Sequence, residues 1–212
     1  MTKFKAHRWH SLTVLLLVFT ALIGDQTSHA AAVRAPESEK VLEIERYKYE
    51  PMQLVDLKIG TQSVKDRIVP RFRDERSKIG LDRVSFTEAD DWFTRVSLTL
   101  RNVSEKPVYG VRAYLVLKFE GQSLRYGMSL MSARLLRNDP LQPGGEIELT
   151  IVPRELEALS GNLKSAGLNG SPSEVTLLFD AVNFSEVLQW SRGSLLRPDS
   201  TVFGKWVPVD RP

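Results

Sequence analysis

Apolar and polar residues alternate along three stretches of the chain, as they do in strands with one buried face. These stretches are residues 96–101, 111–119 and 147–151. In the second, Leu115 falls on the apolar face and Val116 on the polar face. One buried face and one solvated face is typical of antiparallel sheets. The pattern therefore predicts three strands of this kind.

A further alternating stretch at residues 54–59 predicts another strand, and residues 175–184 are expected to form the next one. Before the last of these strands a helix is expected to begin, because Pro153 can occupy the first position of a helix. The leucines that follow recur at helical spacing: Leu156, Leu159 and Leu163. This predicts one short connecting helix near 153–164. Several short strands with a single helix favour an all-β fold, an immunoglobulin-like antiparallel β-sandwich.

Residues 1–30 have the three parts of a secretory signal peptide. A basic start without acids precedes an apolar run at 12–23, and a small-residue pattern follows at 28–32. We expect cleavage after Ala30, with a cut after Ala32 as the alternative. The apolar run is shorter than the roughly 20 residues that span a bilayer, so we expect no stable transmembrane segment after processing, a retained anchor being the alternative.

The expected destination is the periplasm or the outside of the cell. Behind the cut, residues 31–50 begin with small and charged side chains, and we expect a flexible lead-in. Residues 51–212 are of the usual size for one domain, and we expect them to form the single sandwich.

The charge balance argues against a nucleic-acid partner. The chain has 29 Lys and Arg against 26 Asp and Glu, and the leader holds Lys3, Lys5, Arg8 and Asp25. The rest of the chain therefore has 26 basic and 25 acidic residues, a net charge of +1. A balanced chain does not create the positive field that attracts nucleic acid.

Histidine and cysteine are missing from the expected mature chain. The three histidines are His7, His10 and His29, and the sequence has no cysteine. This excludes Ser-His-Asp triads, Cys-His dyads, thiol redox chemistry and the usual zinc sites. We expect no metal and no cofactor, and we assign no catalytic residue.

The C-terminal stretch contains the strongest candidate binding residues, because Trp and Arg are favoured anchors in interfaces. They are Trp190, Arg192, Arg197 and Trp206. The alternative is that the tryptophans fill the edge of the sandwich while the arginine stems cover them.

Two charged segments are further candidates. The carboxylates of Glu88, Asp90 and Asp91 could bind calcium or supply a pair for glycoside hydrolysis, the alternative being a solvated loop. The locally basic residues 65–78 are expected to form a long loop or a short edge segment. They could contact an anionic envelope polymer or lipid headgroups, the alternative being a solvent-facing loop.

Residues 96–151 resemble bacterial exported immunoglobulin-like modules of the FxLYD kind. The matching features are a strand ending in Asn102, the turn after it, the strand to Phe119, and Pro143-Gly144-Gly145-Glu146 before another strand. Leu117-Lys118-Phe119-Glu120 stands where such modules have Leu-Tyr-Asp. The resemblance implies a noncatalytic module and brings no site residues with it.

Together these features predict an exported, noncatalytic interaction or structural module that binds a protein or an envelope glycan. The alternative is a carboxylate-dependent glycan hydrolase. Two carboxylates about 5–9.5 Å apart in a cleft would favour the hydrolase. A flat patch lined with aromatic or arginine side chains would favour the binding module.

Overall fold

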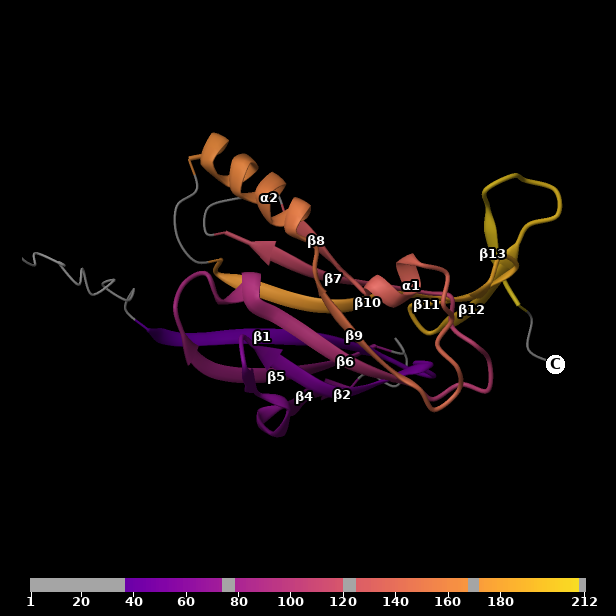
Figure 1. The fold of residues 1–212 in the computed structure, drawn as a ribbon, viewed down its shortest axis with the longest axis horizontal. Coiled ribbons are helices and arrows are strands. Elements are labelled where there is room, and N and C mark those ends of the chain that lie inside the picture. Colours follow the sequence, from indigo (N-terminus) through magenta and orange to yellow (C-terminus); the bar gives the residue numbers. More distant parts are fainter. Residues whose placement is uncertain (1–36, 74–78, 120–124, 168–171, 210–212) are drawn as a thin grey trace, which may run out of the picture. The chain divides into compact units, whose positions relative to one another are not determined.

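The structure, a computed structural model, describes residues 37–73, 79–119, 125–167 and 172–209 (Figure 1). The expected signal peptide and its cut sites lie outside these ranges, as do residues 74–78 of the basic segment. The described chain is mostly β, as the alternation predicts. Its strands are β1 (Ser38–Tyr47), β2 (Met52–Ile59), β3 (Gln62–Ser63), β4 (Val69–Arg73), β5 (Ile79–Glu88), β6 (Val96–Asn102), β7 (Gly110–Lys118), β8 (Arg125–Met131), β9 (Glu146–Ile151), β10 (Glu174–Ser185), β11 (Leu188–Ser191), β12 (Ser194–Pro198) and β13 (Trp206–Pro208).

These strands form one curled sheet with the order β13-β12-β11-β10-β7-β8-β9-β6-β2-β3. Strand β1 pairs with both β10 and β5, and β4 pairs with β5. The sheet is mixed, because β1 and β10 run parallel at Glu43↔Thr176 and Ile44↔Leu177. The expectation of a purely antiparallel sheet is therefore wrong at this pair. Alternation along one strand does not encode the direction of a neighbour that is distant in sequence.

The expected flexible lead-in at 31–50 is wrong over Ser38–Tyr47, which forms β1. This strand pairs with β5 along its whole length. Its charged residues alternate with Leu42 and Ile44, whose side chains are fully buried. The many charges suggest a solvated segment, but two large aliphatic side chains on one face are enough to hold a strand against the core.

The alternation in β6, β7 and β9 is confirmed by burial. Leu98, Leu100, Leu115 and Leu149 are fully buried, whereas Val116 is only partly buried. Strands β6 and β9 pair with each other, as do β7 and β8. The core therefore lies between the apolar faces of these strands, with polar side chains on the opposite faces.

The predicted connecting helix is confirmed as α2 (Pro153–Ser165), which begins with Pro153. Leu159 is buried, and Leu156 and Leu163 pack against the core. Figure 1 shows α2 beside β8, where the Ser129 N–H donates to the Glu155 carboxylate. This bond satisfies a backbone donor of β8 that β9 does not reach, because the two strands pair only at Leu130↔Ile151 and Met131↔Thr150.

The remaining helices are short. They are η1 (Lys65–Arg67), η2 (Trp92–Arg95) and α1 (Ala133–Leu136). Ser132 begins α1 and accepts a hydrogen bond from the Arg134 N–H, which is the usual role of serine at a helix start. Within the described ranges, neither α-helix combines the length and apolar character needed to cross a membrane.

Strand β10 lies at a fork that positions the candidate site. One edge of β10 pairs with β7 from Glu174 to Asn183. The other edge pairs first with β1 and then, from Ala181 onward, with β11. Because β1 and β11 share this edge, Tyr47 of β1 meets Trp190 of β11, with ring centroids 5.9 Å apart in an edge-to-face contact.

Candidate functional site

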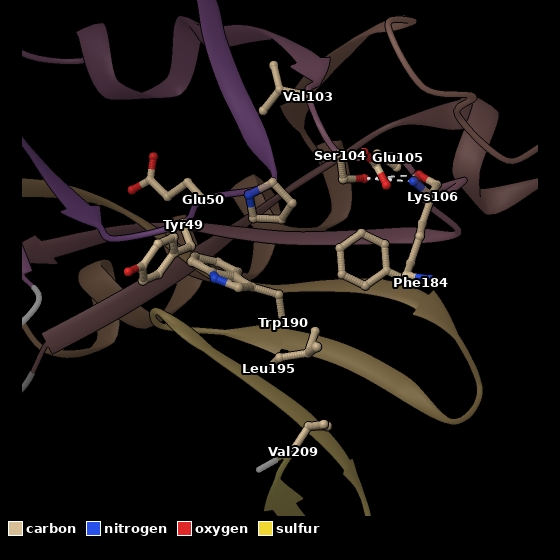
Figure 2. A pocket seen from close by; sticks show the side chains of 11 residues that line it. Tyr49, Glu50, Val103, Ser104, Glu105, Lys106, Phe184, Trp190, Leu195 and Val209 are labelled. Atoms are coloured by element: carbon tan, nitrogen blue, oxygen red, sulfur yellow. Dashed lines mark hydrogen bonds between the residues drawn. The ribbon is translucent and has the colours of Figure 1, made fainter. Parts of the chain in front are cut away.

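Trp190, one of the predicted binding residues, lies at a concave site. Its side chain is only 3% exposed, so for Trp190 the burial considered as the alternative is confirmed, and an exposed anchor is not. It forms part of the floor of a groove of about 490 Å³ that we call the Trp190 groove (Figure 2). The residues lining it are Tyr49, Glu50, Pro51, Val103, Ser104, Glu105, Lys106, Phe184, Trp190, Leu195 and Val209.

Three separate parts of the chain build the Trp190 groove. The turn between β1 and β2 supplies residues 49–51, and the connector after β6 supplies residues 103–106. The rest comes from the end of β10 and from the ribbon of β11, β12 and the chain after β13. Both turns at the rim present exposed apolar side chains, since Tyr49 is 65% and Val103 is 52% exposed.

Tyr49 is held in a backbone conformation that tyrosine rarely adopts, with φ at 59°. A left-handed conformation costs about 1–3 kcal/mol for a residue other than glycine. The same turn faces the β11–β12 hairpin, because a Cβ added to Gly193 would lie 3.6 Å from the Lys48 carbonyl oxygen. The two turns are therefore packed together, and their contact fixes Tyr49 at the rim of the groove.

Asn102 holds the connector that forms the opposite wall. Its side chain is fully buried, and its Nδ2 donates to the Lys106 and Leu141 carbonyl oxygens at 2.8 and 3.1 Å. Its Oδ1 accepts from the Ser104 N–H and from the Ser104 hydroxyl at 3.0 and 2.7 Å. The Asn102-Val103-Ser104 triplet matches the acceptor pattern for N-glycosylation, but here the amide nitrogen is used inside the fold.

The polar side chains of the Trp190 groove are largely engaged with the protein itself. The two carboxylate oxygens of Glu50 accept from the Tyr47 N–H and from the Arg46 guanidinium, both at 2.5 Å. The Ser104 hydroxyl contacts Asn102 and Lys106. Among the described residues the Trp190 indole N–H has no hydrogen-bond partner, but this atom is itself buried. What remains for a ligand is a mainly apolar floor with Glu105 and Lys106 at the rim.

Burial raises the pKa of Glu50 above its usual value, and Arg46 together with the Tyr47 N–H offsets only part of this rise. A carboxyl whose pKa is raised by folding stabilises the protein fully below its unfolded-state pKa. That contribution is lost as the pH rises through the folded-state pKa.

We therefore expect Glu50→Gln to gain stability relative to the natural chain as the pH rises from about 4.5, the usual glutamate value. Glutamine mimics the protonated carboxyl and does not titrate, and the Arg46 pairing of the ionised Glu50 is already included in the net rise of its pKa. Chemical denaturation of both proteins across this pH range measures the difference. A difference that moves in the opposite direction would mean that the Arg46 pair outweighs burial.

Arg192 lies in the two-residue turn between β11 and β12, away from the lining of the Trp190 groove. With φ at 45° it precedes Gly193 at 83°, the conformation of a type I′ turn. Its Nε donates to Asp180 at 3.0 Å, and Arg112 contacts the same carboxylate at 3.3 Å. The sequence prediction groups Arg192 with Trp190, but the structure assigns it to a surface ion-pair cluster.

Strand register separates the two other predicted residues. Leu195 pairs with Trp190, and Arg197 pairs with Val207, which places these four side chains on one face of the ribbon. Trp206 pairs with Pro198 and lies on the opposite face. The structure therefore places Arg197 on the same face as Trp190 but does not bring Trp206 to it.

The acidic group at 88–91 is neutralised by nearby cations. Arg95 contacts both Glu88 and Asp91, at 2.9 and 3.3 Å, and Lys40 contacts Asp90 at 2.5 Å. Among the described residues, no group of three or more acidic side chains is arranged to hold a metal ion. These contacts favour a structural role for the acids over the calcium or catalytic role considered from the sequence.

The described part of the basic segment is the edge of the sheet. Residues 65–67 form η1 and residues 69–73 form β4, which pairs only with β5. The short edge segment considered from the sequence is thus confirmed. Basic side chains are common on edge strands because they discourage pairing with other chains, and this role explains Arg71, which is exposed.

Sequence reasoning misses most of the Trp190 groove. Tyr49 and Pro51 fall in the expected lead-in or at its border, and Val103 and Lys106 fall in a segment interpreted as a turn. The signal that could have found them is an apolar residue inside a turn, which Tyr49 and Val103 both provide.

Comparisons with protein-family models, with curated proteins and with solved structures find no match to this chain.

Proposed function

We propose that this chain is an exported, noncatalytic interaction module whose Trp190 groove binds an apolar segment of a partner protein. The observation that carries the proposal is the groove itself. It has a volume of about 490 Å³ and an apolar floor, and Tyr49 and Val103 are exposed at its rim. Concave sites with apolar floors and few polar groups are the usual places for ligands. Exposed aromatic side chains are preferred anchors in protein interfaces.

A protein partner is favoured over an envelope glycan at this groove. Sugars are bound largely through their hydroxyl groups, which need uncommitted donors and acceptors. Glu50 and Ser104 are already engaged by Arg46, Tyr47, Asn102 and Lys106. Apolar side chains of a protein need no such partners, and burying them releases water from the floor.

The same contacts disfavour the glycan hydrolase. Hydrolysis needs one carboxyl that gives up a proton and a second that attacks or activates water. In the groove, both oxygens of Glu50 serve Tyr47 and Arg46, and Glu105 is exposed at the rim. The arrangement therefore supports binding rather than bond cleavage.

We also propose that the sheet is an immunoglobulin-like sandwich. Strands β8 and β9 pair at only two positions. The sheet therefore nearly separates between them into one part that contains β7 and β8 and another that contains β9 and β6. Leu98 on one part and Leu115 on the other are fully buried. Two inner faces that bury alternate side chains support this architecture.

Export is part of the proposal and rests on the leader at residues 1–30. Expression in a bacterium with an intact secretion pathway is expected to yield a chain that begins at Ala31, or at Val33 if the alternative cut after Ala32 is used. Intact mass and N-terminal sequencing of the periplasmic or secreted fraction measure the start. A chain in that fraction that still begins at Met1 would contradict the expected cleavage of this leader.

The groove is tested with peptides selected from a random displayed library. We expect selected peptides to share aromatic or aliphatic residues, and a double variant Tyr49→Ser, Val103→Ser to bind them at least about tenfold more weakly, since burying such side chains contributes roughly 1.5–3 kcal/mol each. Val187→Ser is the matched control, because Val187 is also 65% exposed but does not line the groove. Equal affinities for the double variant and the natural chain would contradict the proposal.

A further inference from the structure

A second hollow, of about 550 Å³, shares no lining residue with the Trp190 groove. Its lining residues are Tyr109, Asn138, Asn183, Ser185 and Glu186, and we call it the Tyr109 hollow. They come from the connector before β7, the turn after α1, the end of β10 and the turn that follows it. Unlike the Trp190 groove, this hollow is lined mainly by polar side chains around one exposed aromatic ring.

Backbone contacts bring Tyr109 and Asn183 together. The Tyr109 N–H donates to the Asn183 carbonyl oxygen at 2.8 Å, and Gly110 pairs with Asn183 across the sheet. A Cβ at Gly110 would lie only 3.1 Å from the Asn183 Nδ2. Glycine at this position therefore leaves room for the amide beside Tyr109, whose own side chain is 50% exposed.

Asn138 reaches the hollow from another part of the chain. It follows α1 in a left-handed conformation with φ at 56°, which asparagine tolerates better than most residues. The pairing of Val108 with Leu141 holds the chain after Asn138 against the connector that contains Tyr109. The two segments are thus fixed to each other, and the hollow is formed before any ligand arrives.

The fold engages one of these polar side chains, the Ser185 hydroxyl, which accepts from the Val187 N–H at 3.2 Å. Across residues 37–73, 79–119, 125–167 and 172–209, no hydrogen bond or ion pair involves the side chains of Tyr109, Asn138, Asn183 or Glu186. Two amides and a carboxylate offer both donors and acceptors, and the tyrosine adds a hydroxyl. This is the opposite of the Trp190 groove, where the polar groups are engaged internally.

We propose that the Tyr109 hollow binds a neutral oligosaccharide. The apolar C–H face of a sugar ring stacks on an aromatic ring, and Tyr109 presents such a ring with a polar tip. The Asn138 and Asn183 amides bind hydroxyl or acetamido groups, each of which needs both donors and acceptors. Glu186 is the one charged residue among those that line the hollow, so acidic sugars are repelled. This second site goes beyond the proposed protein-binding groove.

The oligosaccharide leaves the hollow uncleaved. Glycoside hydrolysis uses two carboxyl groups across the scissile bond, and Glu186 is the one carboxylate among the lining residues. The site therefore adds binding of a glycan to binding of a protein on the same module.

Titration of the isotopically labelled full-length mature protein with two neutral probes tests the site. These neutral probes are the trimers of N-acetylglucosamine and of glucose, which differ in their acetamido groups. The acidic trimer of galacturonic acid is titrated for comparison. We expect at least one to shift the amide signals of Tyr109, Asn138 and Asn183. Tyr109→Ala and Asn138→Gly should each weaken that binding about tenfold, the loss of one good contact. Glycine tolerates the positive φ at position 138, so Asn138→Gly tests the loss of the side-chain amide alone.

Phe203→Ala is the matched control, since it removes an exposed aromatic ring that lines neither site and should leave sugar binding unchanged. The two proposals fail separately, because the two sites share no lining residue and a loss of apolar peptide binding at the Trp190 groove leaves the sugar result intact. Three outcomes would overturn the oligosaccharide site. They are no shift with either neutral trimer, binding that survives both variants, and shifts caused only by the acidic trimer of galacturonic acid.

Discussion

Leu115→Ala is expected to lower the free energy of unfolding by about 2–5 kcal/mol, the usual cost of emptying a buried leucine site. Leu115 is fully buried in β7, between β10 and β8. Alanine would remove apolar surface from the core and leave a cavity that neighbouring strands cannot fill without losing their register. Urea denaturation followed by circular dichroism measures the change.

Val116→Ala is the matched comparison, one position along the same strand. Val116 lies on the opposite face and is only partly buried, so alanine there should cost much less than at Leu115. Equal losses at the two positions would mean that β7 is buried equally on both faces. The assignment of one core face to this strand would then be wrong.

Asn102→Ala is expected to cost roughly 2–4 kcal/mol, since each of several buried hydrogen bonds contributes about 1 kcal/mol. The side chain bonds the Lys106 and Leu141 carbonyl oxygens and both polar groups of Ser104. Its loss should also loosen the wall of the Trp190 groove. Thermal and urea denaturation measure the first effect, and binding of a selected apolar peptide measures the second.

Ser104→Ala is the comparison, because it removes the hydroxyl contact but keeps the Ser104 N–H bond to Asn102. We expect a smaller loss of stability and a connector that stays in place. If Asn102→Ala melted and bound peptide like the natural chain, Asn102 would not be the residue that orders this wall.

The sequence alone predicts the elements in which buried residues recur at a regular spacing within one short segment. Strands β6, β7 and β9 bury every second residue, and α2 begins at a proline and repeats leucine at helical spacing. In these segments a residue and its near neighbours on the same face determine the structure. Contacts with residues that are distant in sequence then stabilise strands and a helix that the local pattern already predicts.

Strand β1 could not be predicted in this way. Its Leu42 and Ile44 are surrounded by charged residues, and charge in a short window argues for solvent. The strand is stabilised by β5 and by a parallel contact with β10, neighbours that lie far away in sequence. The fork at β10 depends on the same long-range pairing.

The candidate sites depend even more on such contacts. The sequence singles out Trp190, but this side chain packs against Tyr47, which no local pattern connects to it. Tyr49 and Val103 reach the Trp190 groove from two different turns. Tyr109 and Asn183 meet through a backbone hydrogen bond between the connector before β7 and the end of β10. Local spacing cannot bring such residues together, because strand order decides which turns are neighbours.

The most direct test of the protein-binding proposal is a map of the amide signals that shift when a selected apolar peptide binds. We expect shifts to gather in three separate parts of the chain at once, because together they line the Trp190 groove: at Tyr49 and Glu50, at residues 103–106, and at Phe184, Trp190 and Leu195. Shifts confined to β4, or to the face of the ribbon that carries Trp206, would contradict it.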